Sequence, residues 1–231
     1  RLAELGITVR AKSIVGDDRH DLAAQLRAAL ERAPLVITTG GLGPTDDDLT
    51  RDVAAEVLGL VQREDPDVLR AVAERFTRRG IPMPDINRRQ ARVPEGAVVL
   101  DNPNGSAPGL FFDVDGRLLV LLPDPPRETQ PMFEAHARPR LAPAVGHPVV
   151  RRRVLKITGR SESQVEEIAQ PIYARLSTPD LPVTTTILAS PGQIELHVSA
   201  LGPDPVVLDA RLEAGVLQLA AALAPSVFSV D

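Results

Sequence analysis

The chain has 231 residues, of which 43% are hydrophobic and 25% are charged, and its formal net charge at pH 7 is -5. This composition is typical of a globular protein with one large domain or two smaller ones. The negative charge argues against a general nucleic-acid or acidic-membrane surface. The absence of cysteine excludes disulfides, thiolate metal sites and a cysteine nucleophile. No apolar run approaches the roughly 20 residues of a membrane span, so we expect a cytoplasmic protein.

The first part of the chain alternates between strand and helix patterns. The apolar run 35–37 lacks polar alternation, as in a strand buried on both faces of a parallel sheet. Asp115 and Gly116 form a hairpin signal. In chain order the pattern predicts a helix end at 2–6, a strand at 7–15, helices at 22–33, 49–57 and 65–80, an ordered loop at 81–96, strands at 97–100, 110–114 and 118–122, and a helix at 128–141 broken by Pro131 and Pro139.

The second part is expected to form a smaller α+β domain after a linker at 142–148. Ser161 and Gln164 fit a capping box at a helix start. The predicted elements are a strand at 153–158, a helix at 162–176 kinked at Pro171, two hairpin strands at 183–189 and 193–200, and a helix at 205–223. The expected domains are therefore 1–143, of the α/β class, and 149–231.

A glycine-rich joint follows the apolar run at 35–37. It reads Thr38-Thr-Gly-Gly-Leu-Gly-Pro-Thr-Asp-Asp-Asp-Leu-Thr50. Its glycines let a phosphate approach the backbone at the end of a strand, where parallel sheets bind ligands. Thr45 can donate its hydroxyl, and the carboxylates of Asp46, Asp47 and Asp48 can hold a divalent metal ion. The alternative is an ordinary turn before a helix N-terminus that favours acidic residues.

Three further clusters carry groups suited to nucleotide chemistry. Asn87 and Gln90 can read a base or ribose edge, although a surface loop also explains them. The run Asn102-Pro-Asn-Gly-Ser-Ala-Pro-Gly109 joins two strands and is also typical of turns. Arg127 can pair with a phosphate, and Glu128 can bind metal or act as a base. The alternative for this pair is a rigid proline turn at a helix start. The four histidines show no ligand spacing.

These motifs together resemble the competence/damage-inducible protein A (CinA) family, over nearly the whole chain. The glycine-rich joint matches the signature of that family. The other matching segments follow in the family's order: Asn87-x-x-Gln90-Ala91-x-x-Pro94, Asn102-x-x-Gly105-Ser-Ala-Pro-Gly109, Leu122-Pro-x-x-Pro-x-Glu128, Gly159-x-Ser161-Glu162-Ser163 and Val227-Phe-Ser-Val-Asp231.

The resemblance implies a mostly parallel, three-layer MoaB/MogA-like α/β domain followed by a KH-like α+β module. It implies a metal-dependent ADP-ribose pyrophosphatase, which splits ADP-ribose into AMP and ribose 5-phosphate with Mg²⁺, Mn²⁺ or Co²⁺, and a homodimer. The family's first strand, with its Gly-Asp-Glu-Leu-like segment, is expected before Arg1. Nothing in the chain matches the C-terminal nicotinamide-mononucleotide deamidase domain of the family.

On this reading we assign site roles as a hypothesis. Asp47 and Asp48 position the metal, and Glu128 is a metal ligand or general base. The nucleotide and its phosphates contact Gly40, Gly41, Leu42, Gly43, Thr45, Asn87, Gln90, Asn104 and Gly105. Asp124 departs from the family, which usually has glycine there, and the added charge can weaken anion binding or supply a metal ligand. Thr129 replaces a usual methionine.

Two rival functions remain open at this point. The same fold and loop support molybdopterin binding or adenylyl transfer elsewhere, and fold alone does not decide function. A non-catalytic ligand-binding and dimerising scaffold for a deamidase domain is the second rival. RNA binding is disfavoured, because the second domain has no Gly-x-x-Gly clamp of the kind a KH site needs.

Overall fold

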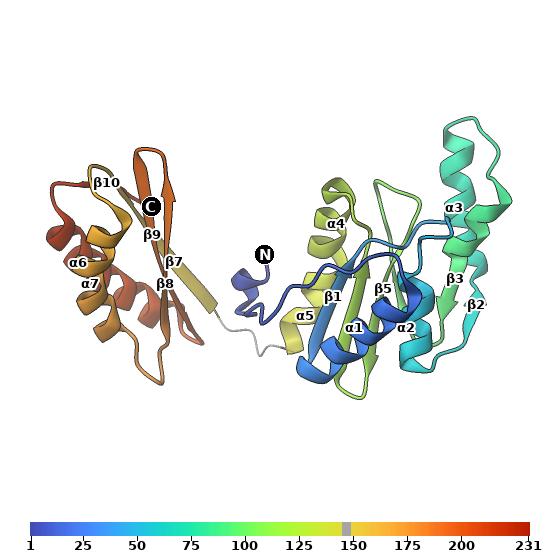
Figure 1. Ribbon diagram of the computed structural model, residues 1–231, viewed down its shortest axis with the longest axis horizontal. Coiled ribbons are helices and arrows are strands. Elements are labelled where there is room, and N and C mark those ends of the chain that lie inside the picture. The colour runs from blue at the N-terminus through green and yellow to red at the C-terminus, as the bar shows by residue number, and fades with distance from the viewer. Residues whose placement is uncertain (145–148) are drawn as a thin grey trace. The chain divides into compact units, whose positions relative to one another are not determined.

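The computed structural model describes residues 1–144 and 149–231, and these form two compact units (Figure 1). The first unit is Arg10–Leu141, and the second unit combines Arg1–Val9 with Ala142–Asp231. The first unit therefore begins nine residues later than the expected range 1–143, because Arg1–Val9 contacts the second unit instead, where the short 3-10 helix η1 (Ala3–Leu5) meets a strand.

The first unit is built on a four-stranded sheet of order β1-β6-β5-β4. Only β1 and β6 are parallel, so the expected mostly parallel arrangement is wrong for the other two pairs. The reason is local: Asp115 and Gly116 have φ of 52° and 76°, and a two-residue hairpin of this kind makes β5 and β6 antiparallel. The strands are β1 (Leu35–Thr39), β4 (Val98–Leu100), β5 (Gly109–Val114) and β6 (Arg117–Leu122).

Helices pack against this sheet and bury both of its faces. Leu119 and Leu121 share a core with α1 and α2, and the alternate residues Val120 and Leu122 are equally buried. Asp18 caps the start of α1, because its carboxylate accepts the Asp21 N–H, and the Asp65 carboxylate caps α3 by accepting the N–H groups of Asp67 and Val68. The helices are α1 (Arg19–Arg32), α2 (Thr50–Leu58), α3 (Pro66–Arg78), α4 (Pro126–Met132), the π-helical η3 (Phe133–Ala137) and α5 (Arg138–Ala144).

Three predicted segments of this unit are corrected by the structure. Residues 7–15 form no strand, because no described neighbour pairs with them and Ile14 is 94% exposed. The segment 81–96 is not a loop: it contains the 3-10 helix η2 (Asp85–Ala91) and β3 (Arg92–Pro94), which pairs with β2 (Gln62–Glu64). The helix predicted at 128–141 is not broken at its prolines: Pro131 lies inside α4, Pro139 lies at the second position of α5, and the π-helical η3 joins these two helices without a gap.

The second unit is an α+β module, as predicted. Its antiparallel sheet has the order β10-β7-β9-β8, which with two crossing helices is the β-α-β-β-α-β arrangement of ferredoxin-like domains. The structure shows this ferredoxin-like order, and the KH-like assignment of the module stays a prediction. Ser161 and Gln164 form the predicted capping box. The elements are β7 (Val149–Ile157), α6 (Glu162–Leu176), β8 (Val183–Ser190), β9 (Gln193–Gly202), α7 (Pro205–Leu223) and β10 (Val227–Val230).

The expected linker at 142–148 overlaps the end of α5, and its residues 145–148 lie outside the described part of the chain. Among the described helices, none is long and apolar enough to cross a membrane.

Candidate functional site

Three loops of the first unit meet at one edge of its sheet. The carboxyl ends of the parallel strands β1 and β6 lie at this edge, so loop 40–49 and loop 123–125 both begin there. Leu100 of β4 pairs with Gly109 of β5, which brings the connecting loop 101–108 to the same edge. The structure thus brings the sequence-predicted motifs together at the place where α/β sheets bind ligands.

The glycines of loop 40–49 are required by the backbone and by its neighbours. Gly40 and Gly41 have φ of 97° and 67°, the left-handed region that other residues rarely adopt. A Cβ on Gly41 would also overlap the Thr50 side chain, and one on Gly43 would overlap the Asp48 carboxylate. The bend is therefore tight, and it leads directly into the N-terminus of α2.

Backbone N–H groups in this bend are left without partners. Gly40 N–H donates to the carbonyl of Leu122 at 2.9 Å. Gly41, Leu42 and Gly43 donate no backbone hydrogen bond to any residue that the structure describes. Successive N–H groups of this kind form a concave site for an anion. The Leu42 side chain, by contrast, is 1% exposed and belongs to the hydrophobic core, so only its backbone is available.

The three aspartates of the loop have separate surroundings. Asp46 pairs with Arg89 at 2.5 Å and its side chain is 91% exposed. Asp48 Oδ2 accepts hydrogen bonds from Thr45 N–H at 2.9 Å and from the Thr45 hydroxyl at 2.6 Å. Asp47 is exposed, and its pKa is lowered first by the Thr45 hydroxyl and then by its own backbone N–H. Thr45 thus holds the Asp48 carboxylate beside Gly43 of the glycine bend.

A buried arginine that our sequence reasoning missed holds this loop in place. Arg51, 2% exposed, donates to the carbonyl of Leu42 at 2.5 Å and to that of Arg89 at 2.9 Å. Burial lowers its pKa, and the nearby Asp52 and Asp48 oppose that shift. A charged residue in a helical pattern is normally read as a surface position, so no local signal marked it.

Asn87 and Gln90 are buried in η2 and contact each other. Asn87 Nδ2 donates to Gln90 Oε1 at 3.3 Å, and Gln90 Nε2 donates to the Ser106 hydroxyl at 3.2 Å. Both side chains therefore brace loop 101–108 against η2. Their proposed contact with a base or ribose stays a prediction.

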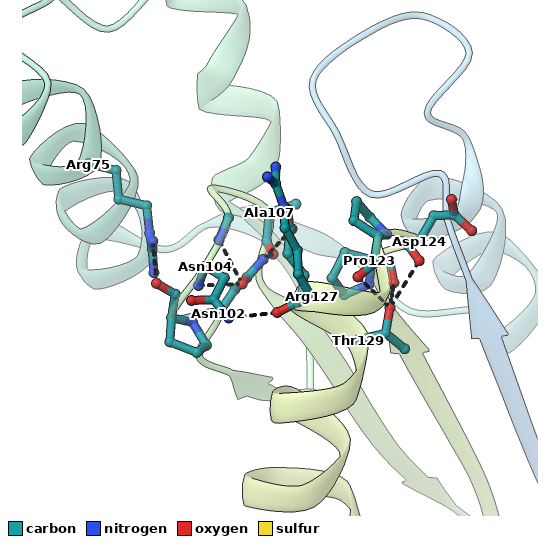
Figure 2. Close-up of polar contacts among 12 residues, drawn as sticks. Arg75, Asn102, Asn104, Ala107, Pro123, Asp124, Arg127 and Thr129 are labelled. Carbon is teal, nitrogen blue, oxygen red and sulfur yellow. Dashed lines mark hydrogen bonds and ion pairs between the residues drawn. The ribbon is translucent and has the colours of Figure 1, made fainter.

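Glu128, at the start of α4, lies among the residues of loop 101–108. It is 7% exposed, and its Oε2 accepts from Asn102 Nδ2 at 2.8 Å. Asn102 Oδ1 in turn accepts the N–H groups of Asn104 and Gly105, at 3.0 and 2.8 Å. Figure 2 shows Asn104 also reaching the Arg127 carbonyl, a contact of 2.6 Å. Arg127 Nε lies 3.8 Å from the other Glu128 oxygen.

Asp124 and Thr129 stand where the sequence departs from the family pattern. Asp124 is exposed. A Cβ added to Gly40 would lie 3.7 Å from the Cβ of Asp124, so the Asp124 side chain borders the glycine bend. The Thr129 hydroxyl bonds the carbonyl of Pro123 and also approaches those of Asp124 and Pro125, which ties the turn to α4 (Figure 2).

The donor set at this edge fits a metal that arrives with a substrate. Within residues 1–144 and 149–231, the one group of three or more acidic or histidine side chains with converging ligand atoms is Asp18, His20 and Asp21, all exposed. Asp47 and Asp48 supply at most a pair of carboxylates. Mg²⁺ is commonly bound by one or two carboxylates together with substrate phosphates. The pair Asp47 and Asp48 fits this way of binding, whereas a site made of protein ligands alone would need more of them.

Several known proteins are similar to this chain over much of its length. The family described as "Probable molybdopterin binding domain" matches residues 1–143. A CinA-like protein of Koribacter versatilis is 39% identical over 235 residues, covering 100% of this chain. The crystal structure of the protein CinA from Thermoplasma acidophilum is 32% identical with a TM-score of 0.55, and the match covers 60% of this chain and 81% of that one. The chain belongs to the CinA family.

This membership confirms the resemblance and the MoaB/MogA-like α/β fold of the first unit. A Desulforudis audaxviator protein of the competence-damage inducible group is 43% identical over all 231 residues of this CinA-family chain. The chain spans about half the length of these relatives, 55% and 56%. Activities of a whole CinA protein are therefore matters for proposal here.

Proposed function

We propose that the first unit is a metal-dependent ADP-ribose pyrophosphatase, which hydrolyses ADP-ribose to AMP and ribose 5-phosphate. The observation that carries the proposal is the meeting of three features at one sheet edge. These are the unpartnered N–H groups at Gly41–Gly43, the carboxylate pair Asp47–Asp48, and the buried carboxylate of Glu128.

Each part has a distinct role in the proposed reaction. The N–H groups of the bend bind one phosphate of the pyrophosphate and stabilise the charge that develops there as the bond breaks. Glu128, held by Asn102, accepts the proton of the attacking water. The water adds to one phosphorus atom, the bridging bond breaks, and the two products leave as phosphate monoesters.

Asp47 and Asp48 are the residues that would hold the divalent ion. When bound, such an ion neutralises charge on the pyrophosphate and lowers the pKa of an attacking water. The lowered pKa of Asp47 keeps that carboxylate ionised well below neutral pH, as a metal ligand requires. For Asp48 to serve as a ligand, its bond with Thr45 has to be shared or released.

The test is AMP release from ADP-ribose in the presence of Mg²⁺, Mn²⁺ or Co²⁺. We expect turnover by the wild type, and a loss of roughly 10²-fold or more in kcat/KM for Asp47→Ala and of similar size for Glu128→Gln. The matched control is Asp17→Ala, an exposed aspartate remote from the loops of the site in sequence. Turnover that is equal in the absence of metal contradicts the proposal.

The same preparation separates the rival functions. Conversion of molybdopterin and ATP to an adenylylated product, without AMP release from ADP-ribose, supports the adenylyl-transfer reading. The family name, with its molybdopterin-binding description, favours testing that reaction directly. Binding of ADP-ribose without any turnover supports the non-catalytic scaffold. The homodimer stays a prediction, to be checked by sedimentation.

A further inference from the structure

A pocket of about 280 Å³ lies in the first unit between α3 and the loop 101–108. Its apolar lining comes from one side of α3, from β4 and from loop 101–108: Val68, Ala71, Val72, Val99 and Pro108. The volume lies just below the range of about 300–1,000 Å³ that is usual for small-molecule sites. Walls of this chemistry suit a planar, weakly polar group of the size of a nucleoside.

The polar groups of the pocket are mostly carboxylates. Asp65, Asp67 and Asp101 line it, and carboxylates accept hydrogen bonds from amines and hydroxyls. Arg75 is the cation of the lining, and it is 19% exposed. Its Nη1 donates to the Pro103 carbonyl at 3.2 Å, and Figure 2 shows it reaching from α3 to that loop. Asp67 pairs with Arg70, and Asp65 accepts the N–H groups of Asp67 and Val68. A free phosphate is still disfavoured here, because the lining has three carboxylates and one arginine, which contacts the Pro103 carbonyl and lies 4.0 Å from Asp101.

The pocket shares a wall with the candidate active site. Asn102 and Ser106 line the pocket, and both also belong to the polar network of the site. Asn102 donates to Glu128 at 2.8 Å, and Ser106 accepts from Gln90 at 3.2 Å. A ligand seated in the pocket would thus contact Asn102, the residue that donates to the carboxylate of Glu128.

We propose that this pocket is the nucleoside subsite, which takes the adenine and ribose of the AMP half of ADP-ribose. The inference rests on the proposed function. The apolar walls bury the base, the carboxylates accept from its amine and from ribose hydroxyls, and the phosphates extend away from them toward the glycine bend. Ribose 5-phosphate, which has no base and carries a phosphate dianion, gains nothing from these walls.

The proposal is tested by a substitution that places a large side chain in the pocket. Ala71 is exposed and lines the pocket, so Ala71→Trp adds bulk there without entering the core. Thr77→Trp is the matched control, because Thr77 is exposed on α3 and does not line the pocket. Affinities for AMP and for ribose 5-phosphate are measured by titration calorimetry, and steady-state kinetics are measured with ADP-ribose. Circular dichroism confirms that both variants are folded.

We expect Ala71→Trp to raise the Kd for AMP at least about tenfold, and to raise the KM for ADP-ribose while kcat stays near its wild-type value. Thr77→Trp and the wild type should not differ, and ribose 5-phosphate binding should be the same in all three. Unchanged AMP binding in Ala71→Trp, or a wild type that does not bind AMP, overturns the subsite. AMP binding that Ala71→Trp abolishes, in a wild type without turnover, supports the subsite and overturns the pyrophosphatase.

Discussion

At Gly105 the candidate site has no room for a methyl group. A Cβ there would overlap the Glu128 carboxylate and lie 2.6 Å from Asn102 Nδ2. The backbone of Gly105 is not in the left-handed region, so the glycine is needed for space and not for conformation. Two motifs more than twenty residues apart are therefore fitted to each other at this point.

Gly105→Ala is expected to displace Glu128 and to lower kcat/KM for ADP-ribose by about 10²-fold, the effect of a shift of about 1 Å in a reacting group. Circular dichroism at the assay temperature checks that the variant is folded, because Gly105 and Glu128 are both buried. The control is Gly16→Ala, where a Cβ meets nothing within 4 Å. An alanine variant with full activity would show that Glu128 is not where catalysis occurs.

Arg51 is the residue on which the shape of the glycine bend depends. Arg51→Met removes both donors and leaves the carbonyls of Leu42 and Arg89 unpaired. We expect the first unit to lose about 2–4 kcal/mol of unfolding free energy in urea, followed by circular dichroism. Arg27→Met is the control, because Arg27 makes only an exposed ion pair with Glu56. An equal midpoint for the two variants would contradict this role.

At the scale of elements, local chemistry predicted most helix ends and turns. Asp18, Asp65 and the Ser161–Gln164 box all cap helices as the sequence indicates. Pairing between distant segments was not predictable in the same way. Strands β2 and β3 have three residues each and are about thirty residues apart in the sequence. Each is a strand because it pairs with the other, and no local pattern indicates this pairing. The alternating apolar and polar residues at 7–15 pair with no described strand, and this segment therefore forms no strand.

Strand β7 and helix α7 of the second unit are joined by a charge cluster that titrates. Asp209 accepts from Arg151 Nε at 3.1 Å and from Arg153 Nη2 at 3.0 Å. Its pKa is lowered first by the hydrogen bond with Arg151, against desolvation, and further by Arg153. A lowered pKa in the folded state contributes stability that is complete above the unfolded value of about 3.9 and is lost as the pH falls through the folded value.

We therefore expect the Tm of the second unit to fall as the pH drops below about 4, and to fall less steeply in Asp209→Asn. Tyr173, the one tyrosine of a chain without tryptophan, lies in this unit and reports its unfolding by fluorescence. Asp180→Asn, at an exposed position of the same unit, is the control. Identical acid profiles for Asp209→Asn and the wild type would contradict the prediction.

At the scale of the whole molecule, each of the two units has a hydrophobic core of its own, and the candidate site lies in the first unit. Three of the segments that resemble the CinA family, at 38–50, 102–109 and 122–128, come together at the sheet edge of the first unit. Which residues would face a ligand was less predictable, because Asn87 and Gln90 are used to brace a neighbouring loop and Thr45 is used to hold Asp48. A sequence shows which groups are present, whereas their partners depend on tertiary contacts.

The central claim is that the bend at Gly41–Gly43 binds the pyrophosphate through its backbone. Amide NMR during titration with a non-hydrolysable methylene analogue of ADP-ribose and Mg²⁺ measures this directly. The account predicts that the N–H resonances of Gly41, Leu42 and Gly43 shift most, while those of Gly16 and Gly192 stay in place. Saturable binding of the analogue that leaves the three amides of the bend unshifted would contradict it.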